Sequence, residues 1–561
     1  MPEHYSLAGH AWLPVALASG QRAFVRPCDI TSEIDGHVIV RIATGRPDCD
    51  ISLTEFMIGL LAVSMGPKDP RDWLKRYRVP PAREELAASI APFEPALILD
   101  GEGPRFFQDR EALDGEPGSI SGLLIDAPGA NTIKDNADHF VKRGRTGVLS
   151  RAGAAIVLAT LQTSAPSGGA GHRTSLRGGG PLSTLVLPGA PNTVEPSLWE
   201  RLWANVPEAM RAEPDETKRI FPWLTPTRVS DKTGVATTPE DVSPAQAFFG
   251  MPRRIRLVFE PNPGKRTCDL LCTIDDVVVT GYVTRPWGTN YIAWGGFHPL
   301  SPHYRMKKDA VELLPLHLQS SRVGYRQWLG LVMKTEDGLR LPARCVSDFY
   351  ARAVNFKGDD AVVLRGARLL AAGYAMDNMK PLDFGEALMP LIIAADAAAN
   401  ETISRQAEAF IRAAEAVASQ LLNSIKLALY GERAKADRDS AVLEPVRNRF
   451  WSDTEQDFYR ELRTAAERIE NHAGQLQDHE AAIAEQCAQA WRQVLERAAL
   501  RIFDDTVPID SAESSKLEDV ITGRRFLVNA LRGFGAVGAG LFKQLRLPPA
   551  ETKTKKGRKA A

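Results

Sequence analysis

The sequence predicts an α+β protein, with a large N-terminal mixed domain followed by a four-helix bundle. Residues 1–385 alternate short apolar runs with turn residues and contain most of the 38 prolines, which is typical of a domain with many connections. From about Gly385 the sequence changes to an alanine-rich pattern with a helical apolar period. We therefore expect an α+β domain over residues 1–385, a bundle over 386–550 and a disordered basic tail over 551–561.

Three segments of the N-terminal domain have clear secondary-structure patterns. Ser52–Met65 is expected to form a helix, with Ser52 as its N-cap and Glu55 at the capping-box position. Arg254–Phe259 and Cys272–Val283 contain alternating or clustered β-branched residues, which predicts two strands. The turn-rich residues 222–244 are expected to form a surface excursion.

In the C-terminal region, four segments with helical periodicity are separated by short breaks, which favours a four-helix bundle. These segments are Ala387–Leu429, Thr454–His472, His479–Phe503 and Ser514–Leu531. Some of them are longer than an average helix, as is common in bundles.

The charge balance limits the class of protein. The chain has 69 basic and 69 acidic residues, so its formal net charge is zero. A free-standing nucleic-acid-binding protein usually has a basic excess, because neutralising phosphates supplies much of its affinity. Contact with nucleic acid is therefore expected through local patches or within a larger basic assembly. The first residues lack the basic and apolar regions of a signal peptide, and no run of 18 apolar residues occurs, so we expect a cytoplasmic protein that makes no membrane contact.

The six cysteines are too sparse for a disulfide framework. Cys268 and Cys272 are the only close pair, and their spacing fits half of a zinc site. No second pair or neighbouring Cys/His cluster completes four ligands. We expect ordinary thiols and no bound metal, with zinc as the alternative.

Two stretches distinguish this chain: residues 123–144 (LLIDAPGANTIKDNADHFVKRG) and residues 166–189 (PSGGAGHRTSLRGGGPLSTLVLPG). The second holds six glycines between Gly168 and Gly180, interleaved with Arg173 and Arg177. Because glycine weakens helices and strands, this density indicates close approach of the backbone to a ligand, or φ angles that a side chain forbids. With arginines beside it, the expected ligand is a phosphate backbone or a base edge. From the residues alone, a flexible surface loop is an equal alternative.

The common enzyme motifs fail in this sequence. Gly264-Lys265 is followed by Arg266 and lacks the earlier glycine of a Walker motif, and the glycines at 169 and 171 are not followed by a third at Thr174, as the Rossmann fingerprint requires. No HExxH or GxSxG pattern is present. A nucleotide-binding enzyme that uses the glycine-rich residues 167–180 is kept as the alternative function.

Several motifs together resemble a known family. The AWLPV segment at Ala11–Val15, the PGANT and DHFVKRG motifs, the GGAGHRTSLRGG stretch, and the later TGYVTRPWG, HPLSP and RFWSDTEQDFYREL motifs are similar to CasA, the large subunit of the type I-E CRISPR surveillance complex, Cascade. The resemblance spans roughly residues 11–535. Each motif alone is weak, but their order and approximate spacing are fairly specific.

The resemblance implies a glycine loop that presents backbone groups in the minor groove of the protospacer-adjacent motif (PAM) of the target DNA. Arg285, in TRPWG, lies near where the family places a basic residue that reaches PAM bases; a cation packed on an aromatic ring is the alternative. The residues that match the glycine loop are Ser167, Gly168, Gly169, Ala170 and Gly171.

The resemblance also implies a wedge at the tip of a β-hairpin, inserted beneath the PAM to part the strands. The family often has amide residues at this tip, and Asn378 is the best match to its glutamine. Met is a suitable apolar wedge between base steps, whereas Asp377 is hard to justify near phosphates. A plain turn is the alternative. The expected tip residues are Met376, Asp377, Asn378 and Met379.

The loop at residues 128–142 is the third implied site. In the family this loop reaches the guide-RNA handle and the backbone subunits, where an aromatic residue makes contact. We expect Asn131, Phe140 and Lys142 to make these contacts, although a lone phenylalanine is more often part of a core.

The function implied by the resemblance is non-catalytic, needs no cofactor and belongs to antiviral defence. The protein is expected to recognise the PAM in double-stranded DNA, to promote strand separation and R-loop formation, and to recruit the helicase-nuclease. The expected partners are the crRNA, double-stranded target DNA, the backbone, small and handle-binding subunits of Cascade, and the helicase-nuclease. The target sequence beyond the PAM is expected to be recognised by base pairing with the guide RNA.

Overall fold

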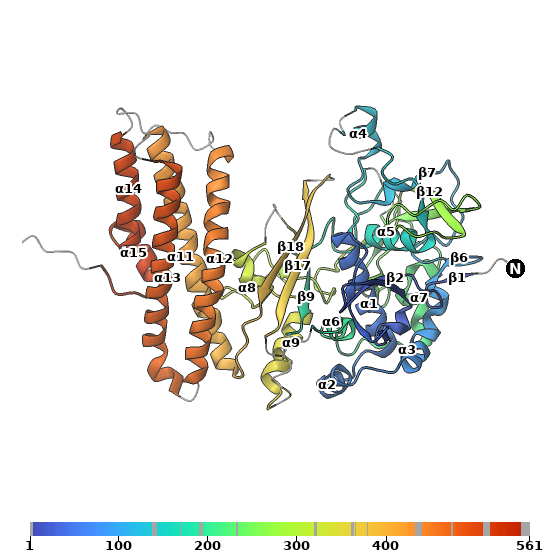
Figure 1. Ribbon diagram of the computed structural model, residues 1–561, viewed down its shortest axis with the longest axis horizontal. Coiled ribbons are helices and arrows are strands. Elements are labelled where there is room, and N and C mark those ends of the chain that lie inside the picture. Colours follow the sequence, from blue (N-terminus) through green and yellow to red (C-terminus); the bar gives the residue numbers. More distant parts are fainter. Residues whose placement is uncertain are drawn as a thin grey trace, which may run out of the picture. The chain divides into compact units, whose positions relative to one another are not determined.

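The computed structural model divides the chain into two compact units (Figure 1). The first comprises residues 1–323, 330–332 and 338–391, and the second comprises residues 324–329, 333–337 and 392–561. The structure describes residues 4–136, 138, 143–169, 171–189, 195–231, 234–318, 323–358, 360, 364, 366–377, 380–431, 440–472, 475–508 and 517–550. The predicted basic tail, 551–561, lies outside the described residues.

The chain before residue 392 mixes helices and strands, which confirms the predicted α+β class. Its described helices are α1 (Pro47–Met65), α2 (Pro70–Arg78), α3 (Arg83–Ile90), α4 (Ala130–Lys134), α5 (Arg151–Ser164), α6 (Leu198–Trp203), α7 (Thr217–Ile220), α8 (Trp328–Leu331) and α9 (Arg344–Asn355). Its described strands are β1 (Tyr5–Ser6), β2 (Leu13–Leu17), β3 (Arg22–Val25), β4 (Glu33–Ile34), β5 (His37–Ile42), β6 (Ile98–Asp100), β7 (Gly118–Ser119), β8 (Leu149–Ser150), β9 (Ser183–Leu187), β10 (Ala236–Thr237), β11 (Arg254–Pro261), β12 (Val277–Arg285), β13 (Asn290–Tyr291), β14 (His303–Tyr304), β15 (Leu314–Pro315), β16 (Arg340–Leu341), β17 (Arg368–Asp377) and β18 (Lys380–Pro390).

The strands form several small sheets rather than one large one. Three of them are antiparallel and place the site: β3–β2–β5–β4, β11–β12 with β7 and β8 on β12, and β18–β17–β9. The smaller groups are β1–β6, the parallel pair β10–β13, and β15–β14–β16. Because each sheet is short, helices and loops supply much of the packing around it.

Helix α1 lies in the core of the first unit, because almost all of its residues are buried. It begins at Pro47, five residues before the predicted start, with Arg46 as the N-cap. Proline is well suited to the first helical position because its missing N–H has no partner there. The predicted capping role of Ser52 and Glu55 is therefore wrong, since both lie inside the helix and are 3% exposed.

An aromatic cluster packs against α1. Phe56 of α1 makes an edge contact with Phe106, and Phe106 makes one with Trp223. Trp223 is fully buried and donates from Nε1 to the carbonyl oxygen of Ala96 at 2.8 Å. The expectation that residues 222–244 form a surface excursion is wrong at its first turn, because this tryptophan anchors the segment in the core.

The two predicted strands are present with shifted bounds. Arg254–Phe259 falls within β11, as expected, whereas the second strand begins at Val277 rather than Cys272. Just before this start, the carboxylate of Asp275 accepts from Arg151 at 2.6 Å, and the chain bends at Asp276. The antiparallel pairing places Arg254 opposite Arg285.

The second unit is a bundle of long helices. The helices are α11 (Ala397–Tyr430), α12 (Ser440–Asn471), α13 (Leu476–Thr506), α14 (Leu517–Leu531) and the shorter α15 (Gly535–Gln544), drawn in orange to red in Figure 1. This confirms the predicted four-helix bundle and adds α15 beside it. A stacked pair at its centre joins Phe410 of α11 to Trp491 of α13, and Trp491 Nε1 donates to the carbonyl oxygen of Phe410 at 2.9 Å.

Two predicted helix starts in this region are wrong. The first helix does not open at Ala387, which pairs with Ala371 in the β17–β18 ladder; it begins at Ala397 with Asp396 as its cap. The second helix begins at Ser440 rather than Thr454. Alanine-rich sequence satisfies a strand ladder as well as a helix when a neighbouring strand supplies the partner groups.

Among the described residues, no single helix is long and apolar enough to cross a membrane. Helices α1 and α2 taken together meet the length and composition of a span, but the chain bends by 115° between them.

Candidate nucleic-acid interface

A tight turn follows the end of α5. The N–H of Gly168 donates to the carbonyl oxygen of His172 at 3.3 Å, and the N–H of His172 donates to that of Gly169 at 3.1 Å. Gly169 and Gly171 have φ angles of +88° and +77°, a region in which other residues are strained. We call the described residues Ser167, Gly168, Gly169 and Gly171 the glycine turn. Ala170, which the sequence assigns to the same turn, lies outside the described residues.

The glycines of this turn serve different purposes. A Cβ on Gly168 would collide with the guanidinium of Arg253, and a Cβ on Gly171 would lie 2.7 Å from the Cβ of Pro286. A Cβ on Gly169 would have no neighbour within 4 Å. Two of the glycines are thus required by the protein's own packing, whereas Gly169 presents its backbone to open space.

The TRPWG motif lies directly against the glycine turn. The N–H of Trp287 donates to the carbonyl oxygen of Gly171 at 2.6 Å, and Trp287 itself has a φ of +66°. Arg285, two residues earlier, ends β12 and is exposed. Its guanidinium makes no hydrogen bond or ion pair with the residues that the structure describes. The structure therefore brings together the two segments that the sequence assigned to PAM recognition.

Arg173 fixes the TRPWG motif in this position. Its Nε donates to Ser230 Oγ at 2.8 Å, and its Nη2 donates to the Ser230 carbonyl oxygen at 3.0 Å. Ser230 in turn donates from Oγ to the carbonyl oxygen of Gly288 at 2.6 Å. The guanidinium carbon of Arg173 also lies 5.5 Å from the ring centroid of Trp287. These side-chain donors are used within the protein, so the expectation that Arg173 meets a nucleic acid is replaced by a supporting role.

Arg253 was missed by the sequence reasoning. It precedes β11, is 9% exposed, and donates from Nη2 to the carbonyl oxygen of Pro166. Its Nε is buried without a partner within the described residues. Burial lowers the pKa of Arg253 to about 10, so the side chain stays charged at neutral pH. No sequence pattern indicates it, because Arg253 lies just outside the alternating strand β11.

The second half of the glycine stretch faces inward. Arg177 is 5% exposed and donates from Nη2 to Glu55 at 2.6 Å, so the prediction that it meets a ligand is wrong. A Cβ on Gly178 would lie 2.8 Å from His317 Nε2, and one on Gly180 would lie 2.7 Å from the Cε of Met376. These glycines allow close approach to the protein's own strands and histidines rather than to a nucleic acid.

Strands β17 and β18 form the predicted hairpin and run side by side (Figure 1). Of the expected tip, Asn378 and Met379 lie outside the described residues. Met376 is half-buried, and its side chain lies against Gly180. Asp377 is exposed at the end of β17. Within the described part of the tip, Met376 therefore packs against the chain's own backbone, and the wedge role of the tip stays a prediction.

The loop at residues 128–142 is described only in part. Asn131 lies in the first turn of α4. Phe140 and Lys142 lie outside the described residues. Arg143 organises the part that is described, because its Nη2 donates to the carbonyl oxygen of Ile133 and to Asn136 Oδ1, each at 3.0 Å.

The predicted cysteine pair is not matched by further ligands. Cys268 is buried, whereas Cys272 is exposed and donates from its N–H to the carbonyl oxygen of Cys268 at 2.9 Å. Among the described residues, no three His, Cys, Asp or Glu side chains are placed to hold a metal ion.

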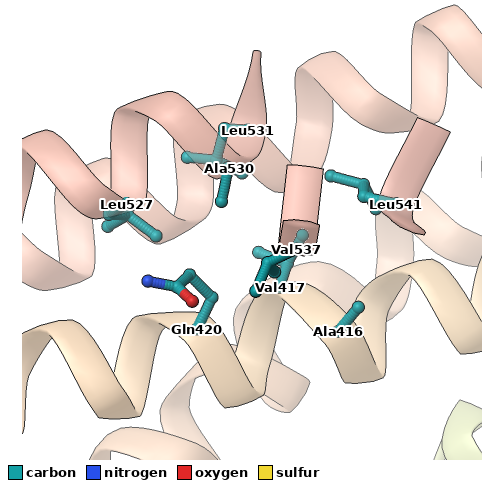
Figure 2. Close-up of a pocket in the computed structure, with 8 residues that line it drawn as sticks. All are labelled: Ala416, Val417, Gln420, Leu527, Ala530, Leu531, Val537 and Leu541. Atoms are coloured by element: carbon teal, nitrogen blue, oxygen red, sulfur yellow. The ribbon is translucent and has the colours of Figure 1, made fainter. Parts of the chain in front are cut away.

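An apolar crevice lies between helices of the bundle (Figure 2). Side chains from α11, α14 and α15 converge on it, but the crevice is too narrow to hold a water molecule. It is therefore a packing gap rather than a ligand site. The lining residues are Ala416, Val417, Gln420, Leu527, Ala530, Leu531, Val537 and Leu541.

Comparison with known proteins identifies the family and the fold. The family model described as CRISPR-associated protein Cse1 matches residues 7–502. CasA of Thermus thermophilus has a similar fold, with 20% identity, a TM-score of 0.66, and coverage of 94% of this chain and 99% of that one. Cse1 of Thermobifida fusca is 16% identical, with a TM-score of 0.65 and coverage of 97% and 98%.

A chain from a CRISPR RNA-guided surveillance complex is also similar, at 16% identity, a TM-score of 0.64, and coverage of 94% of this chain and all of that one. None of the curated protein sequences matches this chain significantly. At these identities the solved structures establish the shared fold.

Proposed function

The chain belongs to the Cse1 (CasA) family of CRISPR-associated proteins, and we propose that it is the non-catalytic large subunit of a type I-E, Cascade-like surveillance complex. In this role it recognises the PAM in double-stranded DNA, promotes strand separation and recruits the helicase-nuclease. Its partners are the crRNA, the other subunits of the complex and the target DNA, and it acts in the cytoplasm without a cofactor.

One observation carries the proposal for PAM recognition. The hydrogen bond from Trp287 to Gly171 holds the TRPWG motif against the glycine turn. The exposed Arg285 at the end of β12 and the open backbone at Gly169 thus belong to adjoining segments. A backbone without side chains fits a narrow groove, and a free guanidinium near it can reach a base edge or a phosphate.

The zero net charge fits the same role. A subunit that contributes a local contact inside an assembly does not need a basic excess, because other components can neutralise most phosphates. Strand opening at the β17–β18 tip would then begin beside the PAM, and base pairing with the guide would read the remaining sequence.

The alternative function, a nucleotide-binding enzyme, is disfavoured by the topology of the glycine stretch. Phosphate loops of such enzymes connect a strand to the N-terminus of a helix, where free N–H groups and the helix dipole attract the phosphate. Here the glycine stretch runs from the C-terminal end of α5 to β9. The chain order is therefore the reverse of the one that phosphate loops use.

The test compares the complex reconstituted with and without this subunit. Filter binding should show that the full complex prefers a duplex with the correct PAM over one with a scrambled flank, while the free subunit binds both weakly. Tight, sequence-specific binding by the free subunit, or a complex without PAM preference, would contradict the proposal.

A further inference from the structure

Arg253 differs from the other buried arginines that the structure describes. Arg177 is paired with Glu55 at 2.6 Å, and Arg352 is paired with Glu208 at 2.9 Å. Arg253 is buried to a similar extent, yet it has no carboxylate partner among the described residues, and its Nε has no acceptor. Among these three buried arginines, Arg253 is therefore the one whose positive charge has no carboxylate beside it.

A buried charge without a counter-charge destabilises the folded protein. Removing a guanidinium from water costs free energy that an opposite charge normally offsets. Buried charges in folded proteins are normally paired. A buried charge that the fold leaves unpaired commonly marks a functional site. The counter-charge is therefore expected from outside the chain.

The position of Arg253 indicates where that counter-charge lies. Its guanidinium packs against Gly168, so closely that a Cβ there would collide with it. In the same turn, the N–H groups of Gly169 and Gly171 have no acceptor within the described residues. Free backbone N–H groups beside residues with positive φ form concave sites that bind anions.

We propose that Arg253 is a phosphate-binding residue of the glycine turn and neutralises one backbone phosphate of the target duplex. The free N–H groups of the turn donate to the phosphate oxygens, and the guanidinium supplies the charge at its edge. This inference rests on the proposed function, because it assumes that the turn meets duplex DNA. The contact of Arg253 with the phosphate does not depend on the DNA sequence, and it is separate from the recognition of PAM bases.

A competing role for Arg253 is purely structural. Its Nη2 bonds the carbonyl oxygen of Pro166, shortly after α5 ends at Ser164, where a cation interacts favourably with the helix dipole. Under that role, removing the charge would destabilise the turn and weaken PAM discrimination, but it would not change the number of phosphates neutralised.

The test uses complexes reconstituted with Arg253→Gln and Arg253→Lys subunits, with binding measured between 50 and 200 mM salt, roughly the range over which phosphate contacts are resolved. We expect Arg253→Gln to weaken binding about tenfold on correct and altered PAMs alike, and to reduce the slope of log K against log salt by about one. Arg253→Lys keeps the charge and should preserve the slope.

A second measurement modifies the DNA and compares the wild-type complex with the Arg253→Gln complex. Single methylphosphonates, which remove one phosphate charge, are placed in turn along both strands around the PAM. One position should weaken wild-type binding and have little further effect on Arg253→Gln. The proposal is overturned if no position shows this coupling, or if Arg253→Gln changes PAM discrimination at an unchanged salt slope. A wild-type complex that lacks PAM preference would instead contradict the proposed function.

Discussion

Arg177 Nη2 lies 2.6 Å from Glu55 Oε2, and this buried ion pair joins the glycine stretch to helix α1. Arg177 Nη1 also donates to Ser183 Oγ at 2.9 Å and to Ser301 Oγ at 3.1 Å. The pair thus connects three segments that are far apart in sequence. It explains why the second half of a stretch that looks exposed in the sequence folds inward.

Breaking this pair should strongly destabilise the first unit. Replacing Arg177 with Met leaves the Glu55 carboxylate buried and uncompensated, which costs about 3–5 kcal/mol of unfolding free energy. Denaturant unfolding followed by tryptophan fluorescence measures the loss. The double variant Glu55→Gln with Arg177→Met should recover much of the stability, because neither charge remains. Equal stability of the single and double variants would show that the cost comes from lost packing instead.

Stability should also fall in mild acid because of His303. Burial, with the nearby Arg177, lowers the pKa of His303 to about 4, and the same causes lower the pKa of His298. The unfolded chain, with a histidine pKa near about 6.5, binds a proton that the native state does not. Stability from this group is therefore complete above about pH 6.5 and is lost as the pH falls towards 4, by about 3 kcal/mol in all.

The measurement for His303 is the slope of unfolding free energy against pH. His303→Gln cannot titrate, so its slope between pH 4 and 6.5 should be smaller than that of the wild type, whatever its absolute stability. Parallel curves for the two proteins would show that His303 does not carry this dependence.

The fold class was predictable because the apolar periodicity of a helix or strand does not depend on how the elements pack together. Helical periodicity after Gly385 and alternation in Arg254–Phe259 reflect which faces are buried, and both elements are present. Boundaries were less predictable, since they depend on tertiary partners. Ala387 joins a strand because Ala371 lies opposite it, and helix α1 starts at Pro47, with the extended Arg46 as its N-cap.

The candidate site was predictable only in part, for a related reason. A glycine-rich sequence indicates that something approaches the backbone closely, but it does not say what. For Gly178 and Gly180 the close neighbours are His317 and Met376 of the same chain, whereas Gly169 remains open. Arg253 was missed because its importance comes from a missing partner, which a sequence does not reveal.

Gly169 provides a sharper test of the glycine turn than Gly171. A side chain at Gly171 would strike Pro286, so a defect there would not distinguish folding from binding. Gly169→Asn projects into open space, and asparagine tolerates positive φ better than most residues. We expect PAM-dependent binding to weaken by about 1–3 kcal/mol. Binding of the assembled complex to target duplex is the measurement.

The matched control for this substitution is Gly20→Asn. Gly20 lies between β2 and β3, has a φ of +84°, and would also have an open Cβ. It therefore carries a similar backbone strain outside the candidate interface. Equal defects in the two variants would mean that strain, rather than contact with DNA, causes the loss.

The tip of the β17–β18 hairpin should affect strand opening only. Replacing Asn378 and Met379 with Gly-Ser keeps the pairing that ends at Asp377 and Lys380 but removes the side chains proposed to part the strands. R-loop formation should slow about tenfold on an intact duplex, because opening one base step costs about 1.4 kcal/mol. A target already unpaired beside the PAM should show almost no defect, since that cost is absent.

The Met376→Ala variant is the control that distinguishes a defect in strand opening from a defect in the folding of the hairpin. Because Met376 lies against Gly180, its truncation should loosen the strand and affect both substrates equally. A Gly-Ser variant that behaves in the same way would assign the hairpin tip to folding or docking. Only a defect confined to the intact duplex supports strand opening, because a wedge lowers the barrier of a step that the unpaired target does not require.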